Sequence, residues 1–219
     1  MGLKTLEHQD KPVFYAGIKG DKLDPQTKSI HVLDAATSIP SQAFLNFAQL
    51  EEIILPPSLK RIGPQAFQGC KKLRSIILPD RVAIIGAQAF RDSGLLEITL
   101  PDSATVIGEK AFAYCKDLRK IRFPAPPNAA EYTPQSSSSS RRLEIGVSVC
   151  KNCVALQDID LPLGVTHLPD GAFKGCKSLE RLRLPDSLQS VGQGAFQGCR
   201  QLKNIEWPHD MSEIVEAFL

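Results

Sequence analysis

The sequence has no apolar run long enough to cross a lipid bilayer, for which a helix needs about 20 residues. Residues 1–10 are polar and lack the hydrophobic stretch of a secretory signal peptide. An excess of charge is missing too, because 26 basic and 24 acidic side chains leave a formal net charge of +2. Nucleic-acid-binding domains are instead basic on one face. We therefore expect a cytoplasmic protein that neither inserts into membranes nor binds nucleic acid.

Signatures of catalysis are missing as well. The sequence has no G-x-S-x-G nucleophile motif and no glycine-rich phosphate-binding loop. The histidines are dispersed along the chain, at His8, His31, His167 and His209. No Cys-His or Ser-His-Asp set of the kind used in nucleophilic catalysis can be placed within one segment. We predict no catalytic residues, no cofactor and no enzymatic activity.

The sequence is instead dominated by a repeat built around the dipeptide Ala-Phe. The phenylalanines of this dipeptide are Phe44, Phe67, Phe90, Phe112, Phe173 and Phe196. They follow one another at steps of 23, 23, 22, 61 and 23 residues. The step of 61 contains one further repeat, with Cys150 at the phenylalanine position, and an insertion of 15 residues. Self-similarity at such a period is the signature of a solenoid.

Each repeat also carries an apolar-x-apolar-Pro segment, which we call a rung. The rungs occupy residues 53–56, 76–79, 98–101, 121–124, 159–162, 182–185 and 205–208. Residues 30–33 fill the same slot with Leu33 in place of proline, which makes eight rungs. Side chains alternate along a strand, so both apolar residues of a rung point to one face. We predict that the rungs stack into a parallel sheet and that proline, which lacks an N–H, ends each strand.

Two more columns, defined as residues at one position of successive repeats, follow this register. Glycines that we expect in tight bends are Gly63, Gly86, Gly108, Gly146 and Gly192. Cysteines three residues after the phenylalanine position are Cys70, Cys115, Cys153, Cys176 and Cys199. Because Ala-Phe-x-x-Cys has the spacing of one helical turn, we expect short helical turns there. In the 22-residue repeat we expect a tightened turn at residues 92–94 and no break in the stack.

The pattern L-x-x-I-x-L-P-x5-I-G-x-x-A-F-x-x-C, which covers residues 29–218, resembles the BspA-type or Treponema pallidum-type leucine-rich repeat. The resemblance implies a curved right-handed solenoid with a role in protein–protein contact or adhesion, and it implies no catalytic residues. We therefore expect an α/β fold that is mostly β. It is a right-handed leucine-rich-repeat solenoid with a parallel sheet on one face and short helical turns and loops opposite.

The chain divides into a cap and a solenoid. Residues 1–28 do not match the repeat, and their apolar side chains suit an N-terminal cap over the first rung, while residues 29–219 form the solenoid. The insertion, residues 125–141, is rich in proline and serine, which predicts a flexible loop or, alternatively, a phosphorylated or partner-binding tether. Residues 217–219 re-enter the Ala-Phe column, so either Trp207 and this last stretch close the core, or further repeats followed and the end belongs to a fragment or associates end to end with another chain.

The cysteines allow two interpretations. Cys150-x-x-Cys153, with Cys176 one repeat further, has the spacing of a metal or redox site. However, these positions belong to core columns, where a free thiol acts as a small hydrophobic group. A ladder also points its side chains in parallel, whereas thiolate ligands need a tetrahedral arrangement. Buried, reduced thiols without a metal are therefore the favoured interpretation.

The outward positions of four consecutive rungs form the candidate binding site. Its residues are Glu52, Ile54, Ser75, Ile77, Glu97, Thr99, Lys120 and Arg122. Ile54 and Ile77 make a small apolar patch rimmed by charge, as interaction sites often do, although β-branched residues also simply favour strands. Outward charges farther along alternate in sign from rung to rung, from Asp158 to Glu206, and should pair with one another.

These features predict a non-enzymatic protein-interaction scaffold that binds an unknown protein partner through its exposed sheet face. The alternative is a structural or surface adhesin-like segment of a longer repeat array. A cysteine-based metal or redox module is the least favoured hypothesis.

Overall fold

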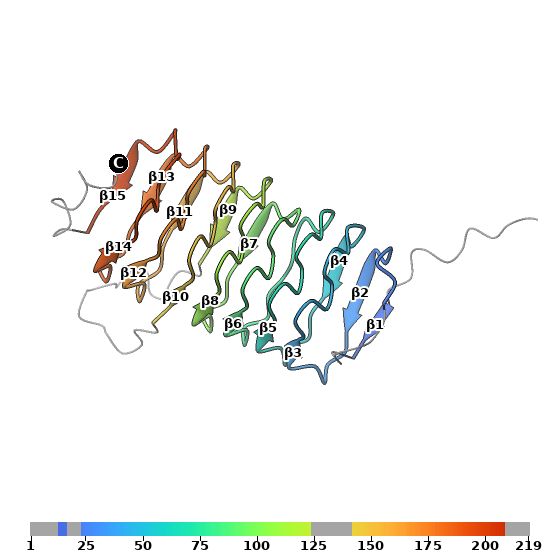
Figure 1. Ribbon diagram of the computed structural model, residues 1–219. Coiled ribbons are helices and arrows are strands. Elements are labelled where there is room, and N and C mark those ends of the chain that lie inside the picture. Colours follow the sequence, from blue (N-terminus) through green and yellow to red (C-terminus); the bar gives the residue numbers. More distant parts are fainter. Residues whose placement is uncertain (1–12, 17–22, 124–141, 209–219) are drawn as a thin grey trace, which may run out of the picture.

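The chain is a parallel β-solenoid of about seven turns in the computed structural model, which describes residues 13–16, 23–123 and 142–208 (Figure 1). Successive repeats lie side by side along one axis, and their short strands form two walls. Strands of both walls pair in parallel with the equivalent strand of the neighbouring repeat. The predicted parallel stacking of the repeats is therefore confirmed.

The first wall, which we call the rung wall, contains the apolar-x-apolar segments. Its strands are β1 (Val13–Tyr15), β2 (Ser29–Val32), β4 (Glu52–Ile54), β7 (Glu97–Thr99), β9 (Lys120–Arg122), β11 (Asp158–Asp160), β13 (Arg181–Arg183) and β15 (Asn204–Glu206). They form two sheets, ordered β1-β2-β4 and β15-β13-β11-β9-β7. Equivalent apolar residues face each other across the pairs, as Ile98 does Ile121. This is the register that the repeat predicts.

The second wall consists of two-residue strands that end just before the glycine column. They are β3 (Ser38–Ile39), β5 (Arg61–Ile62), β6 (Ile84–Ile85), β8 (Val106–Ile107), β10 (Glu144–Ile145), β12 (His167–Leu168) and β14 (Ser190–Val191). The sheet runs from β3 to β10, stops, and resumes as the pair β12-β14. At the stop, Pro169 stands where the two neighbouring repeats have Gly146 and Gly192. Since Gly146 and Gly192 each donate an N–H to the preceding repeat and proline has none, Pro169 removes a ladder bond.

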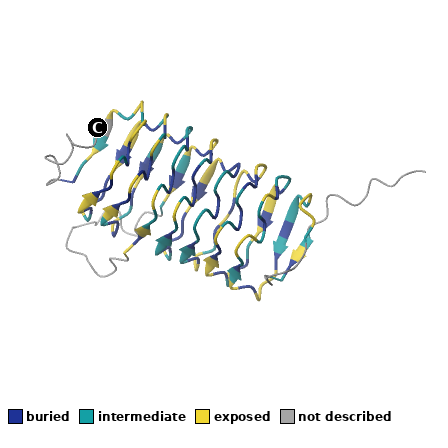
Figure 2. Ribbon diagram, viewed as in Figure 1, coloured by how far each residue is buried: buried dark blue, intermediate teal, exposed yellow. Residues whose placement is uncertain are grey.

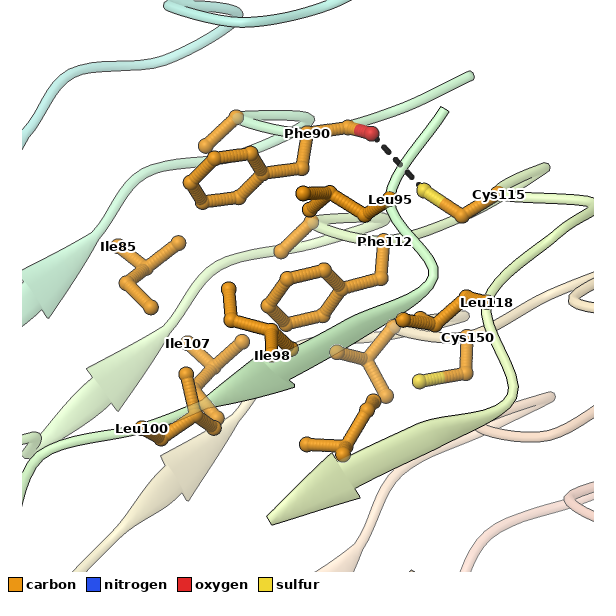
Figure 3. Packing of buried hydrophobic residues seen from close by; sticks show 14 of the residues in the cluster. Ile85, Phe90, Leu95, Ile98, Leu100, Ile107, Phe112, Cys115, Leu118 and Cys150 are labelled. Atoms are coloured by element: carbon orange, nitrogen blue, oxygen red, sulfur yellow. Dashed lines mark hydrogen bonds between the residues drawn. The ribbon is translucent and has the colours of Figure 1, made fainter. Parts of the chain in front are cut away.

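The core is a stack of phenylalanine rings between the walls (Figure 3). Phe67 lies with its ring centroid 5.2 Å from both Phe44 and Phe90, and all three side chains are fully buried. Phe112 continues the stack at 5.6 Å, and Cys150 takes the next position. At the far end the Trp207 ring meets Phe196 edge to face. The Ala-Phe column is therefore the continuous part of the core.

The expected short helical turns are wrong, because the described residues form turns and no helix. Residues two before and two after the phenylalanine position have positive φ, such as Gln65 at 57° and Gly69 at 75°. This left-handed conformation interrupts a helix. Amides of alternate residues instead bond to the next repeat, as Phe67 N–H does to the Ala89 carbonyl at 2.7 Å. The turns thus form a third hydrogen-bonded wall.

The glycine column has a different cause from the expected bend. Gly63, Gly86 and Gly108 do not have positive φ. A Cβ on Gly108 would instead lie 2.5 Å from the backbone nitrogen of Ala87 in the preceding repeat. The same close approach recurs at Gly86, where Pro64 is the neighbour. Glycine is needed at these positions because consecutive repeats touch backbone to backbone.

Candidate binding face

The candidate residues occupy alternate, outward positions along the rung wall. Figure 2 shows that strands of the solenoid mix buried positions with exposed or intermediate ones. Seven of the eight are exposed, and Lys120 is half-buried. β4 carries Glu52 and Ile54, while β7 and β9 pair directly and set Glu97 beside Lys120 and Thr99 beside Arg122. The predicted outward orientation is therefore correct for the whole set.

Ser75 and Ile77 lie on the same face but not in a strand. Within residues 23–123, the sheet stops at β4 and resumes at β7, and the rung at residues 75–77 pairs with neither. The Leu96 N–H donates to the carbonyl of Arg74, just before this rung, at 2.9 Å, and the Arg74 guanidinium donates to the Gly94 carbonyl at 3.2 Å. The expectation of an unbroken stack is wrong for this wall, while the ladders on the other two walls continue.

The break coincides with the 22-residue repeat. The missing residue shortens the loop between Phe90 and Leu95, and the turn at residues 92–94 is tightened as expected. Gly94 lies so close to Lys71 that a Cβ would overlap the Lys71 carbonyl oxygen. Its N–H donates to the Cys70 carbonyl at 3.0 Å. The loop is thus held against the preceding repeat. The rungs before and after it, at residues 75–77 and in β7, form no ladder with each other.

A groove of about 490 Å³ runs along this opening, between residues 75–80 and 97–102. Its apolar lining is Ile76, Ile77, Leu78, Ile98, Leu100 and Pro101. The charged residues that line it are all acidic, namely Asp80, Glu97 and Asp102. Of these lining residues, Ile77 is 86% exposed and is the most exposed large apolar residue in the described part of the chain.

The apolar surface extends further toward the N-terminus than the sequence indicated. Phe14, on β1, is 65% exposed and lies edge to face with His31 at 5.6 Å. Because Phe14 pairs with His31, and His31 with Ile54, the three side chains form one outward column. Sequence reasoning assigned Phe14 to a cap, since residues 1–28 offer no repeat register. The apolar triplet 13–15, which resembles a rung, was the available signal.

Charged side chains on the C-terminal half of this face pair with one another. Arg183 lies 3.5 Å from Glu206, and Arg181 lies 3.6 Å from Asp158. Such exposed pairs contribute only about 0–1 kcal/mol each. These ion pairs nevertheless occupy charged side chains of β11, β13 and β15 with one another. The exposed apolar side chains of this face therefore lie in its N-terminal half.

The column cysteines are hydrogen-bonded thiols. Each S–H donates to a backbone carbonyl of the preceding repeat, as Cys115 does to Phe90 at 2.9 Å and Cys176 does to Cys150 at 3.1 Å. Burial raises the pKa of Cys70 to about 12 and that of Cys199 to about 11. No three His, Cys, Asp or Glu side chains are grouped to hold a metal within the described ranges. These protonated thiols do not favour thiolate chemistry.

One Ser-His pair could not be predicted from the sequence, because its two residues come from neighbouring repeats. His167 Nδ1 lies 2.6 Å from Ser190 Oγ on the second wall. Both side chains are exposed, and Glu144, at the same strand position of β10, is separated from them by the ladder stop at Pro169. The two grooves lined by residues 74–119 with Ala155 and by residues 75–102 do not include this pair, and we assign it a structural role.

A stack of short parallel strands with apolar-x-apolar rungs is the architecture of a leucine-rich-repeat protein. A model of the BspA type leucine rich repeat region matches residues 26–138 and 143–219 with six copies. The chain belongs to this family. Leucine-rich-repeat proteins are generally non-enzymatic scaffolds, and protein binding is their general role.

One solved structure in particular agrees with this assignment. The crystal structure of a T. pallidum leucine-rich-repeat protein is similar, with 28% identity, a TM-score of 0.69, and coverage of 88% of this chain and 83% of that one. A leucine-rich-repeat protein from Bacteroides ovatus has 24% identity and a TM-score of 0.42, over 84% and 67% of the two chains. Comparison with curated proteins gives no match. No helix of the described residues is long and apolar enough to cross a membrane.

Proposed function

We propose that this chain is a non-enzymatic scaffold that binds a protein partner on the N-terminal half of its rung wall. The binding face consists of the predicted residues of β4, of the rung at residues 75–77, which we call the open rung, and of β7, together with Phe14. Lys120 and Arg122 form its border with the self-paired charges. Family membership supports the general role, and the distribution of exposed apolar residues supports the location.

The observation that carries the proposal is the clustering of these residues. The described chain has seven exposed large apolar side chains, and three of them, Phe14, Ile54 and Ile77, are on outward positions within four successive levels of the rung wall, with His31 of β2 between Phe14 and Ile54. Leu33 directly follows β2 and Leu96 directly precedes β7. Singly exposed apolar residues are common, whereas grouped ones mark interaction sites.

Affinity purification from the native cells, followed by mass spectrometry, tests this proposal. The bait is the full chain, compared with the double variant Ile54→Lys/Ile77→Lys. We expect the variant to lose the partners that the wild type retains, because two buried charges would be desolvated without a counter-charge. Its thermal stability should stay nearly unchanged, since both side chains point outward.

The matched control is Val147→Lys/Leu163→Lys. These apolar side chains are exposed to a similar extent, 46% and 41%, but lie outside the rung-wall strands. The control should retain every partner. If the Ile54/Ile77 variant captures the same proteins as the wild type, the location of the binding face is refuted.

A further inference from the structure

We infer that a pocket beside the binding face, between Arg74 and Arg119, receives an aspartate or glutamate side chain of the protein partner. The inference rests on the proposed function and adds the chemical nature of the partner. It is carried by the shape of the pocket, by one unpaired guanidinium in it and by the pairing of the carboxylates around it.

The pocket lies where the chain passes from the turn wall to the rung wall, and we call it the corner pocket. Its volume is about 360 Å³. In the 22-residue repeat only Gly94 stands between Ser93 and Leu95, whereas the preceding repeat has Lys71 and Lys72 at the same place. The short repeat therefore contributes no side chain to this corner. The residues that line the pocket are Arg74, Leu96, Asp117, Arg119 and Ala155.

The corner pocket adjoins the binding face directly. Arg74 immediately precedes Ser75 of the open rung, and Leu96, which is 37% exposed, immediately precedes Glu97 of β7. Three residues separate Arg74 from Ile77, which corresponds to about 10 Å along an extended chain. A partner that covers Ile77 therefore also lies over the pocket.

The charges inside the pocket leave one cation without a partner. The Arg74 guanidinium donates to Asp117 at 2.6 Å and to the Gly94 carbonyl at 3.2 Å, so both of these charged side chains are engaged. Arg119 is exposed, and among the described residues its side chain has no hydrogen bond or ion pair. Two guanidiniums and one carboxylate thus leave a single positive charge, which belongs to Arg119.

The surroundings of the pocket add to this surplus. Lys116 and Lys120 are likewise without an ion-pair partner in the part of the chain that the structure describes. Lys120 stands between two carboxylates of the rung wall, but each of these already has an arginine. Arg122 binds Glu97 at 2.8 Å, and Arg181 lies 3.6 Å from Asp158.

An unpaired carboxylate of the same wall, Asp160, lies too far along its strand to serve the pocket. The Gln157 N–H donates to the Arg119 carbonyl at 3.1 Å, which places Gln157 beside Arg119. Asp160 is three residues further on, or about 10 Å in an extended strand. The positive charge at the corner is therefore available to a partner.

A carboxylate is the group that this arrangement suits. A guanidinium presents its N–H donors as a planar fork, which can bind both oxygens of a carboxylate at once. Leu96 and Ala155 offer apolar surface to the methylene groups behind that carboxylate. A lysine or arginine of the partner would instead face like charge from Arg119, Lys116 and Lys120, which disfavours it.

Selection from a display library of random nine-residue peptides on the immobilised full chain tests this inference. The most enriched peptide is synthesised with a fluorescent label, and its affinity is measured by fluorescence polarisation. We expect enriched peptides to contain Asp or Glu. Affinity should fall about fivefold or more in Lys116→Gln/Arg119→Gln, because two ion-pairing partners are lost. It should also fall when the salt concentration is raised, because salt screens exposed charges.

The matched control is Arg200→Gln/Lys203→Gln. These two exposed residues occupy the same repeat positions as Lys116 and Arg119, four and seven residues after Phe196 as the others are after Phe112. Both double variants remove two positive charges, so the net charge of the protein changes equally. The control should bind the peptide as the wild type does, and thermal melting of both variants separates lost binding from lost folding.

Equal losses of affinity in the two double variants would overturn the inference, because they would show attraction to the overall charge and not to the corner pocket. Enriched peptides without Asp or Glu, full binding by Lys116→Gln/Arg119→Gln, or a library without any enrichment would overturn it as well. None of these results decides the scaffold proposal, which the pull-down with Ile54→Lys/Ile77→Lys tests independently.

Discussion

Replacing Gly108 by alanine should destabilise the protein more than the same change at Gly194. An added Cβ at Gly108 would lie 2.5 Å from the Ala87 nitrogen and 2.7 Å from the Gly86 carbonyl carbon, so the backbones of two repeats must separate. Overpacking of this kind costs about 1–3 kcal/mol. The separation also strains the 2.8 Å hydrogen bond from Gly108 N–H to the Ile85 carbonyl, worth about 0.5–1.5 kcal/mol. The expected loss is about 2–4 kcal/mol.

Gly194 provides the comparison because its constraint is conformational rather than steric. Its φ is +61°, and an added Cβ would meet nothing closer than 3.6 Å. Alanine there should cost only the left-handed penalty, about 1–2 kcal/mol. Urea unfolding followed by circular dichroism measures both losses. Equal losses at the two positions would refute the conclusion that the glycine column exists for close contact between repeats.

Three further predictions concern the core, the thiols and the open rung. Phe67→Ala should lower the free energy of unfolding by about 3–5 kcal/mol in urea titrations, because its fully buried ring stacks on two others, whereas Cys150→Ala should cost clearly less. Because the folded state raises the pKa of Cys70 to about 12, its protonated thiol contributes stability at and below pH 9, and this contribution is lost as the pH rises through about 12. The urea midpoint of the wild type should therefore drop between pH 8 and pH 10, and that of Cys70→Ala should drop by a smaller amount. An equal drop in the two proteins would contradict this. Amides of residues 75–77 should exchange with solvent faster than those of β9 in hydrogen-exchange mass spectrometry, and equal protection would show that the rung is paired in solution.

The register of the rung wall could be predicted from sequence because one physical pattern sets it. Every Ile-x-Leu segment must bury two alternating side chains, so the middle residue faces outward in any stacked arrangement. Ile54, Ile77 and Thr99 were placed in this way, and the structure confirms their orientation. The same reasoning located the cysteine column in the core, as the buried Cys70 and Cys115 show.

The features that could not be predicted depend on backbone conformation. Ala-Phe-x-x-Cys has helical spacing, but Gln65 and Gln88 adopt left-handed φ that glutamine gives no reason to expect. The ladder break at residues 75–77 coincides with a loop of the next repeat that is shorter by a single residue, and neither the rung nor its own loop shows this in sequence. By contrast, Pro169 in a glycine column was a visible signal of the second break, since a proline N cannot join a ladder.

The two ladder breaks also determine how the solenoid responds to mechanical load. One lies at residues 75–77 on the rung wall and the other between β10 and β12 on the second wall. At each break the repeats remain hydrogen-bonded along the third wall, which the turns form. There the Phe67 N–H donates to the Ala89 carbonyl, and the Cys150 N–H donates to the Ala172 carbonyl. Where one wall lacks its ladder and the other walls keep theirs, the solenoid should bend most easily in the direction that opens or closes the wall without a ladder. Bending should therefore concentrate at these two points, in two different directions, with stiff blocks of repeats between them.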